Sequence, residues 1–206
     1  MIEETRLFPT KVFNTHLKYF TPDYEKVILK CMDDLNTKEK WKNNDILYQT
    51  YDSDLHKKYE YKILVDFFHK ALDEIKKHFE YDTEKFTVNL MWANKTYKDG
   101  HHNTHYHPNS FYSGIFYLSS GSPTYFIDPN ILKVSSALSV KSKEENETSF
   151  IGEPGVLLIF PSWLYHGTFS NNTEERMTIS FNSLPTGKTN YKREEHLFSR
   201  MNIQHL

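Results

Sequence analysis

Apolar residues recur at helical spacing in two stretches within the first third of the chain. The first stretch opens at Thr21 and Pro22, which suit an N-cap and a first helical position. Its apolar stripe comprises Tyr24, Val27, Ile28, Cys31, Met32 and Leu35. The second stretch begins near Ser53 or a little later, and its stripe comprises Leu64, Phe68, Ala71, Leu72, Ile75 and Phe79. We therefore expect two amphipathic helices that pack on a core and carry no chemistry.

From residue 86 onward the apolar pattern changes to that of short β-strands. We predict strands over 86–94, 113–118, 124–127, 155–160, 164–169 and 176–184. An extended segment over 7–13 precedes the helices, and Pro9 would confine it to a sheet edge or a bulge. Helices first and many short strands afterwards predict a mainly β fold, a sandwich or barrel with the helices packed on one side.

Four residues of the predicted β region indicate a metal centre beside an anion site. His105 and His107 stand two positions apart, so on an extended segment their side chains point to the same face. His166, brought in from a distant strand, would complete a set of three imidazoles. Imidazole suits iron, zinc, copper and nickel, so the ligand type alone does not name the metal. Arg176 follows and could hold a carboxylate through two parallel hydrogen bonds.

The chain between His166 and Arg176 predicts a hairpin. Residues 170–173 supply turn chemistry, because Asn tolerates the left-handed region of backbone space. The returning strand has a polar face, which comprises Arg176, Thr178, Ser180 and Asn182. That face must line something wet or charged, since it would otherwise carry unmet hydrogen-bonding groups. The alternative for Arg176 is a salt bridge with Glu174.

The order of these residues resembles that of the 2-oxoglutarate/Fe(II)-dependent oxygenases, and the prolyl-4-hydroxylase-like branch most closely. The residues that carry the resemblance are Tyr97, Gly100, His105, His107, Gly121, Thr124, Phe126, Gly155, Phe160, Pro161, His166, Arg176 and Thr178. The run over 107–118 and the early segment over 7–9 also resemble a little-characterised branch of oxygenases with His-x-His in place of His-x-Asp. The resemblance extends over about residues 86–185.

The resemblance implies a double-stranded β-helix, a distorted, cupin-like jelly roll with the metal between its two sheets. It implies Fe(II) as the metal, held by His105, His107 and His166. It implies 2-oxoglutarate as co-substrate, with its distal carboxylate on Arg176 and Thr178, and dioxygen as the oxidant.

Four further residues have candidate roles in binding. Tyr117 and Asn94 are candidate contacts of the co-substrate. Trp163 and Tyr165 flank the third histidine in sequence and are candidates for the substrate mouth, whereas Trp92 reads as a core residue.

The implied activity is that of a non-haem iron dioxygenase, which hydroxylates an unknown substrate and releases succinate and carbon dioxide. Imidazole in place of a carboxylate makes the site one charge more positive, so alternatives stay open. Another ligand set would use Asp99, His101 or His102. The alternative functions are a three-histidine, cupin-like metal protein or a dioxygenase that does not use 2-oxoglutarate, and a catalytically silent jelly roll.

Composition changes this picture little. A chain of 206 residues predicts one domain, with a strand and supporting helices over 1–84, a β-helix core over 85–185 and a tail over 186–206. The polar stretch over 130–149 reads as a lid or a solvated loop. A formal net charge of -2 gives no pull toward nucleic acid or anionic membrane, so we expect a small-molecule or protein side-chain substrate.

The cellular compartment is predicted from what the chain lacks. Cys31 is the single cysteine, so an internal disulfide is excluded and a reducing compartment is favoured. The sequence shows no signal peptide and no apolar run of membrane-spanning length. We therefore expect a cytoplasmic location.

Overall fold

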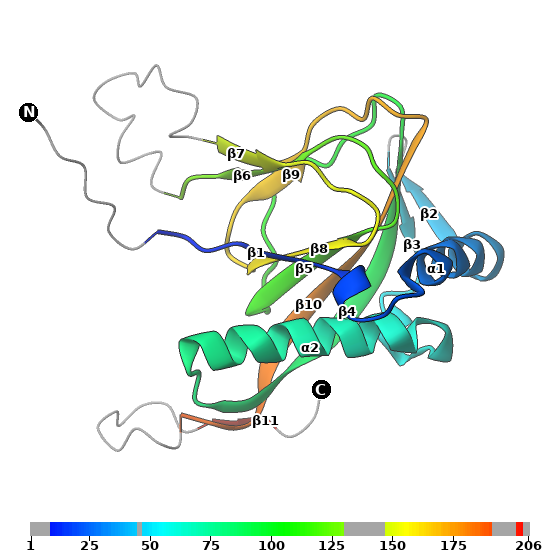
Figure 1. Ribbon diagram of the computed structural model, residues 1–206. Helices are drawn as coiled ribbons and strands as arrows, with labels where there is room; N and C mark the ends of the chain where they lie inside the picture. Colours follow the sequence, from blue (N-terminus) through cyan, green and yellow to red (C-terminus); the bar gives the residue numbers. More distant parts are fainter. Residues whose placement is uncertain (1–8, 45–46, 130–146, 191–200, 204–206) are drawn as a thin grey trace, which may run out of the picture.

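The computed structural model describes residues 9–44, 47–129, 147–190 and 201–203. Within them the strands form two sheets (Figure 1). The large sheet has the order β1-β8-β5-β10-β4-β3-β2, with β11 paired to β10. Its strands are β1 (Phe13–His16), β2 (Trp41–Asn44), β3 (Leu47–Thr50), β4 (Thr83–Tyr97), β5 (Tyr112–Tyr117), β8 (Val156–Pro161), β10 (Glu175–Thr189) and β11 (Met201–Ile203). The small sheet has the order β7-β6-β9, from β6 (Thr124–Ile127), β7 (Glu147–Phe150) and β9 (His166–Thr168).

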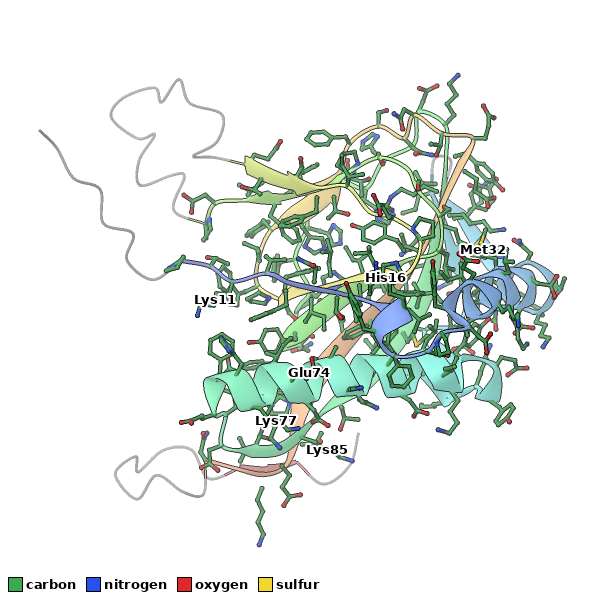
Figure 2. The ribbon with its side chains drawn as sticks, viewed as in Figure 1. Lys11, His16, Met32, Glu74, Lys77 and Lys85 are labelled. Atoms are coloured by element: carbon green, nitrogen blue, oxygen red, sulfur yellow. The ribbon has the colours of Figure 1, made fainter. Side chains whose placement is uncertain are left out.

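Two α-helices, α1 (Tyr24–Lys38) and α2 (Lys62–Phe79), pack with the outer face of the large sheet. In the described part of the chain, three short 3₁₀ turns accompany them, at Leu17–Tyr19, Leu55–Lys57 and Tyr59–Tyr61. Figure 1 shows α2 lying across one face of the large sheet, with the small sheet on the opposite side. The exposed positions of α2 include charged residues such as Glu74 and Lys77 (Figure 2). The predicted division of an amphipathic helix into a buried stripe and a charged face is therefore confirmed.

One hydrophobic core joins the helices to the large sheet. It contains Ile28 and Cys31 of α1 together with residues of α2, β4, β5 and β10. At its centre the rings of Phe68 and Phe181 stack with centroids 4.7 Å apart. Full burial of a large apolar side chain stabilises the fold by about 1.5–3 kcal/mol. A second, smaller core fills the space between the two sheets, from Ile115, Tyr117, Phe126, Leu158, Phe160 and Leu164.

A β-bulge in β4 decides which of its side chains face the helices. Asn182 of β10 pairs with Leu90, but Ser183 pairs with Val88, so one residue of β4 is left over. An extra residue reverses the alternation of side chains beyond it. The core residues of β4 accordingly change from even to odd positions, and they are Phe86, Val88, Met91 and Ala93. Trp92 is thereby turned away from the helix core, where the sequence pattern had placed it.

The predicted fold class, mainly β with helices on one sheet, is confirmed, and some elements differ from prediction. The residue that precedes the first turn of α1 is Asp23 rather than Thr21, and α2 begins only at Lys62. The hairpin of β2 and β3 was not predicted, because β2 is polar and β3 is only half-buried. Neither 1–8 nor 130–146 is among the described residues, so the edge segment is seen only from residue 9.

The C-terminal segment and the end of the predicted loop are also strands. Residues Glu147–Phe150 form β7, which pairs with β6. The segment predicted as a tail from 186 instead continues β10 to Thr189, and Met201–Ile203 pair with that strand. No helix of the described residues is long and apolar enough to cross a membrane.

Candidate metal and co-substrate site

Three histidines meet between the two sheets. One ring nitrogen from each of His105, His107 and His166 lies within 4.8 Å of the other two. The Nε2 atoms of His107 and His166 are 3.2 Å apart, and their rings are nearly parallel, at 8°. Two nitrogens bound to one metal ion at about 2.1 Å each would stand about 3.0–3.4 Å apart. The cluster therefore has dimensions that suit a single ion.

Backbone hydrogen bonds hold the three histidines together. His105 and His166 form an antiparallel bridge, with both N–H···O distances at 2.9 Å. The N–H of His107 donates to the carbonyl of Ser162, also at 2.9 Å. His166 lies on β9, which pairs with β6, whereas β10 pairs with β4 and β5. The predicted hairpin of His166 against the strand of Arg176 is therefore wrong, because the turn between them crosses from one sheet to the other.

Two of the imidazoles are already oriented as ligands. Nδ1 of His166 donates to the carbonyl of Leu164 at 2.9 Å, and Nδ1 of His105 donates to the carbonyl of Asn103 at 2.8 Å. With the proton on Nδ1, a neutral ring has its lone pair on Nε2. Metal-binding histidines are commonly fixed in this way by a backbone carbonyl. A cation among the three rings would use these lone pairs.

Burial favours the neutral form of His107, His166 and His102. Desolvation, with His105 as a like-charged neighbour, lowers the pKa of His166 to about 3 and that of His107 to about 4. Burial likewise lowers the pKa of His102 to about 3, and the next contribution comes from Arg176. Neutral imidazole is the form that binds a metal ion.

The histidines open onto a cavity of about 240 Å³. Its floor is formed by the inner faces of β3, β4, β5 and β10, and its opposite wall by β6, β9 and the segment from His102 to His107. The residues that line it are Leu47, Gln49, Trp92, Asn94, His102, His105, His107, Ile115, Thr124, His166, Gly167, Thr168, Arg176, Thr178 and Ser180. The alternating polar face predicted for β10 thus faces this cavity as far as Ser180.

Arg176 is the most unusual group of the cavity. Its side chain is 2% exposed, and Gly121 makes room for it, since a Cβ there would lie 2.8 Å from Arg176 Cβ. Its Nε donates to the carbonyl of Ser122 and one Nη to Thr124 Oγ1, both at 3.2 Å. None of the ion pairs among the described residues involves Arg176, Glu174 included. Burial lowers its pKa from the ordinary value.

Of the other residues predicted to contact the co-substrate, two line the cavity and one does not. Thr178 and Asn94 line the cavity, and Asn94 Nδ2 donates to Ser180 Oγ at 3.3 Å. Tyr117 does not line it. The guanidinium carbon of Arg176 lies 5.2 Å from the centre of the Tyr117 ring, and the Tyr117 hydroxyl bonds to Thr124 at 2.7 Å. Tyr117 therefore supports Arg176 from behind.

The two residues predicted for the substrate mouth lie outside the cavity. Trp163 and Tyr165 are 52% and 46% exposed, and Tyr165 packs against Tyr106 with ring centroids 5.3 Å apart. Side chains alternate along this segment, so when His166 points inward Tyr165 points outward. Their role in substrate binding stays a prediction.

Several of the residues that line the cavity were not predicted from the sequence. Trp92 places its ring 5.6 Å from that of His107, because the bulge in β4 turns it inward. Gln49 comes from the unpredicted strand β3 and pairs in register with Asn94. His102 was weighed only as an alternative ligand, with Asp99 and His101. In the described residues the cluster of ligand atoms consists of the other three histidines.

Comparisons with known proteins show what this chain resembles in sequence and in fold. Residues 90–182 match a protein family described as "Putative 2OG-Fe(II) oxygenase". A search of curated proteins gave no match. Among solved structures, an oxidoreductase of the 2OG-Fe(II) oxygenase family from Burkholderia pseudomallei is 12% identical, with a TM-score of 0.54. The aligned region covers 79% of this chain and 88% of that one.

Two further structures are similar over most of their length. HygX from Streptomyces hygroscopicus, solved with nickel and 2-oxoglutarate bound, has a TM-score of 0.61 at 12% identity, over 95% of this chain and 92% of that one. A prolyl-4-hydroxylase from Pseudomonas putida has a TM-score of 0.60 at 12% identity, over 86% and 94%. Residues 90–182 thus resemble the 2-oxoglutarate/Fe(II) oxygenases, a class of oxidoreductases, and the chain shares its double-stranded β-helix fold with these solved structures. The matched region includes all three clustered histidines and Arg176.

Proposed function

We propose that this protein is an Fe(II)- and 2-oxoglutarate-dependent dioxygenase, which hydroxylates a small molecule or a protein side chain and releases succinate and carbon dioxide. One observation carries the proposal. Arg176 is a buried cation without a carboxylate partner among the described residues, and it lines the same cavity as the three histidines. An unpaired buried charge is costly, so a guanidinium in this position favours an anionic ligand.

The spacing of the cavity suits a five-carbon oxo diacid. Along β6 and β9, Thr124 pairs with Thr168, and Phe126 pairs with His166. Arg176 donates to Thr124, so the guanidinium and the imidazoles lie two residues apart along these strands. Two residues of a strand span about 7 Å. Four carbon–carbon bonds in a zigzag span about 5 Å, so 2-oxoglutarate could reach from Arg176 to a metal at the histidines.

The donor set fits a divalent metal, and we assign it to His105, His107 and His166. Iron, when bound, supplies the redox chemistry toward dioxygen and the keto acid. The chain's own residues bind and orient. Arg176 and Thr178 hold the distal carboxylate, Tyr117 fixes Arg176 from behind, and Asn94 offers an amide to the bound acid.

We also propose that the whole chain acts as one oxygenase domain. The helices preceding residue 85 and the strands following it share a single hydrophobic core. Neither part could keep its apolar face covered without the other. A truncated chain that begins at the β region would therefore expose the core surface of β4, β5 and β10.

The proposal is tested by the turnover of 2-oxoglutarate. The purified protein, loaded with Fe(II) and ascorbate, should convert 2-oxoglutarate slowly to succinate even without its substrate, and a library of candidate substrates should raise that rate. His166→Ala should abolish turnover, and His78→Ala, near the end of α2 and outside the cavity, should not. Metal binding without any effect of 2-oxoglutarate would favour the three-histidine protein that does not use a keto acid. Absence of tight metal binding would favour the silent jelly roll.

A further inference from the structure

Two hydrogen bonds to Thr168 fix the position of His102 on the cavity wall. Its N–H donates to Thr168 Oγ1 at 2.8 Å, and the N–H of Thr168 donates back to its carbonyl at 3.1 Å. Thr168 pairs with Thr124, and Thr124 accepts a hydrogen bond from Arg176. His102 therefore lies level with Arg176. His105 and His166 bridge one another one step further along the same wall.

The side chain of His102 faces the cavity, and within the described residues its ring nitrogens are free to bind a ligand. It lines the cavity, and its ring centroid is 6.2 Å from that of His105. The clustered ligand atoms of the described residues belong to the other three histidines, so His102 stands beside the metal position. Its ring forms no side-chain hydrogen bond with any described residue, although its backbone is held at both ends. A neutral imidazole in this position has one N–H to offer.

We propose that His102 donates a ring N–H to the distal carboxylate of the bound 2-oxo acid, opposite Arg176. The carboxylate would then be held from two walls, by the guanidinium from β10 of the large sheet and by the imidazole from the segment beside β9. This inference rests on the proposed function, and it names the basis of co-substrate selection. The pocket selects a dicarboxylic 2-oxo acid over a monocarboxylic one because both donors are left without an acceptor when the distal carboxylate is missing.

The test compares two ligands that differ only at that end. Binding of 2-oxoglutarate and of 2-oxopentanoate is measured by anaerobic calorimetry on the Fe(II)-loaded protein, with the metal content of each variant determined alongside. His102→Leu should weaken the binding of 2-oxoglutarate by about 10- to 100-fold. It should change the affinity for 2-oxopentanoate by less than about twofold, since that acid carries a methyl group and no carboxylate at the Arg176 end.

Conservative variants separate hydrogen bonding from packing. His102→Gln and His102→Asn carry an amide N–H near the positions of Nε2 and Nδ1, and the one that restores 2-oxoglutarate binding identifies the donating nitrogen. His101→Leu is the matched control, because His101 does not line the cavity, and it should bind both acids as the parent does.

Three results would overturn the proposal. His102→Leu could weaken both acids equally, which would point to support of the metal ligands or of the fold. It could leave both affinities unchanged, and then His102 contacts neither acid. A parent protein that binds Fe(II) but neither acid would overturn the proposed function itself, and the role of His102 with it.

Discussion

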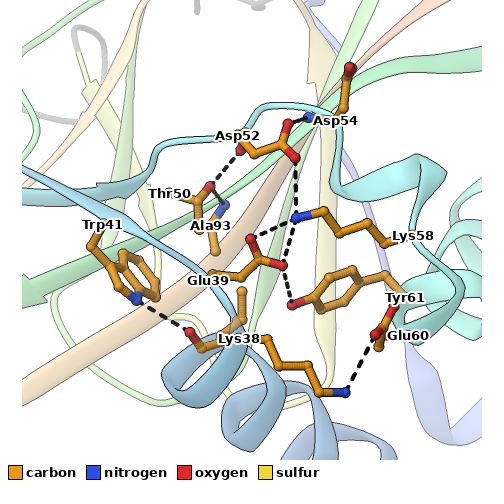
Figure 3. Close-up of polar contacts among 11 residues, drawn as sticks. Lys38, Glu39, Trp41, Thr50, Asp52, Asp54, Lys58, Glu60, Tyr61 and Ala93 are labelled. Atoms are coloured by element: carbon orange, nitrogen blue, oxygen red, sulfur yellow. Dashed lines mark hydrogen bonds and ion pairs between the residues drawn. The ribbon is translucent and has the colours of Figure 1, made fainter.

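Two cationic side chains of this protein, Lys58 and Arg176, are partly or fully buried, and their charges are balanced differently. Near the start of α2, Lys58 donates to both carboxylate oxygens of Glu39, at 2.9 and 2.8 Å, and pairs with Asp52 at 3.1 Å (Figure 3). Tyr61 adds a hydrogen bond to Glu39 at 3.4 Å. The side chain of Glu39 is 5% exposed, but every charge in this cluster has an opposite partner.

Arg176 has no such partner among the described residues, although it is more deeply buried than Lys58. The cluster of Lys58 is complete, and Figure 3 shows its links to the large sheet through Thr50 and Ala93. This contrast distinguishes a buried charge that supports the fold from one that we propose to bind a ligand. A buried charge that is balanced within the chain holds elements together, whereas one left unbalanced beside a cavity favours the binding of an anion.

Metal binding should respond most strongly to substitution. His166→Ala and His107→Ala should each weaken metal binding by more than about 100-fold, beyond the 10- to 100-fold typical of losing an outer partner of a ligand. Calorimetry with Zn(II) or Fe(II) measures this. His107→Asp, which restores a carboxylate, should bind Fe(II) at least as tightly as the parent. Tight binding by both alanine variants would show that the three histidines are not the site.

Arg176→Met should separate binding from stability. We expect the affinity for 2-oxoglutarate to fall by about 30- to 1,000-fold, since a charged partner is lost from a buried ion pair. We expect the melting temperature of the ligand-free protein to stay equal or to rise, because an unbalanced buried charge is removed. Calorimetry and thermal unfolding give the two values. A strongly destabilised variant would mean that Arg176 is structural.

Glu39→Gln should show the opposite behaviour. It leaves Lys58 with a weaker partner, so the free energy of unfolding in urea should fall by about 1–3 kcal/mol. The affinity for 2-oxoglutarate should not change. Asp23→Asn, which breaks the exposed pair with Lys26, is the surface control and should cost under about 1 kcal/mol.

Substitution of Asp52 should have a smaller effect, which appears in the pH dependence of stability. The N–H of Asp54, and then Lys58, lower the pKa of Asp52 below its ordinary value of 3.8, against an opposing effect of burial. Because the folded pKa is the lower one, the ionised carboxylate stabilises the fold above pH 3.8, and this contribution is lost as the pH falls through the folded pKa. Asp52→Asn should cost under about 1 kcal/mol at pH 7, and the difference from the parent should shrink in acid. A constant difference between pH 7 and pH 3 would exclude the ionised form as its source.

Local sequence patterns predicted which side chains share a face, but they did not predict how distant segments meet. Alternation along a strand is a local property, so the two faces of β10 were predictable, with Met177 and Ile179 against the helices and Arg176 and Thr178 in the cavity. The two-residue spacing of His105 and His107 was likewise sufficient to place both on one side.

Three features depend on contacts between distant segments, and local patterns could not predict them. The bulge in β4 reverses the alternation and brings Trp92 into the cavity. The turn after β9 looks like that of a hairpin, but Asn171 anchors it to the carbonyls of Gly100 and Thr96, and the chain changes sheets. The position of His102 is decided by its bonds to Thr168, which is far away in sequence.

Arg176 and the three histidines are proposed to form one site for a chelating keto acid, and one titration decides whether they do. The iron-loaded protein is titrated with 2-oxoglutarate under anaerobic conditions, while the weak visible charge-transfer band of a keto acid that chelates Fe(II) is followed. We predict a saturable band in the parent, and in Arg176→Met a band that appears only at much higher concentrations of 2-oxoglutarate. Bound iron with no band at any concentration, or a band of equal affinity in both proteins, would contradict the proposed site.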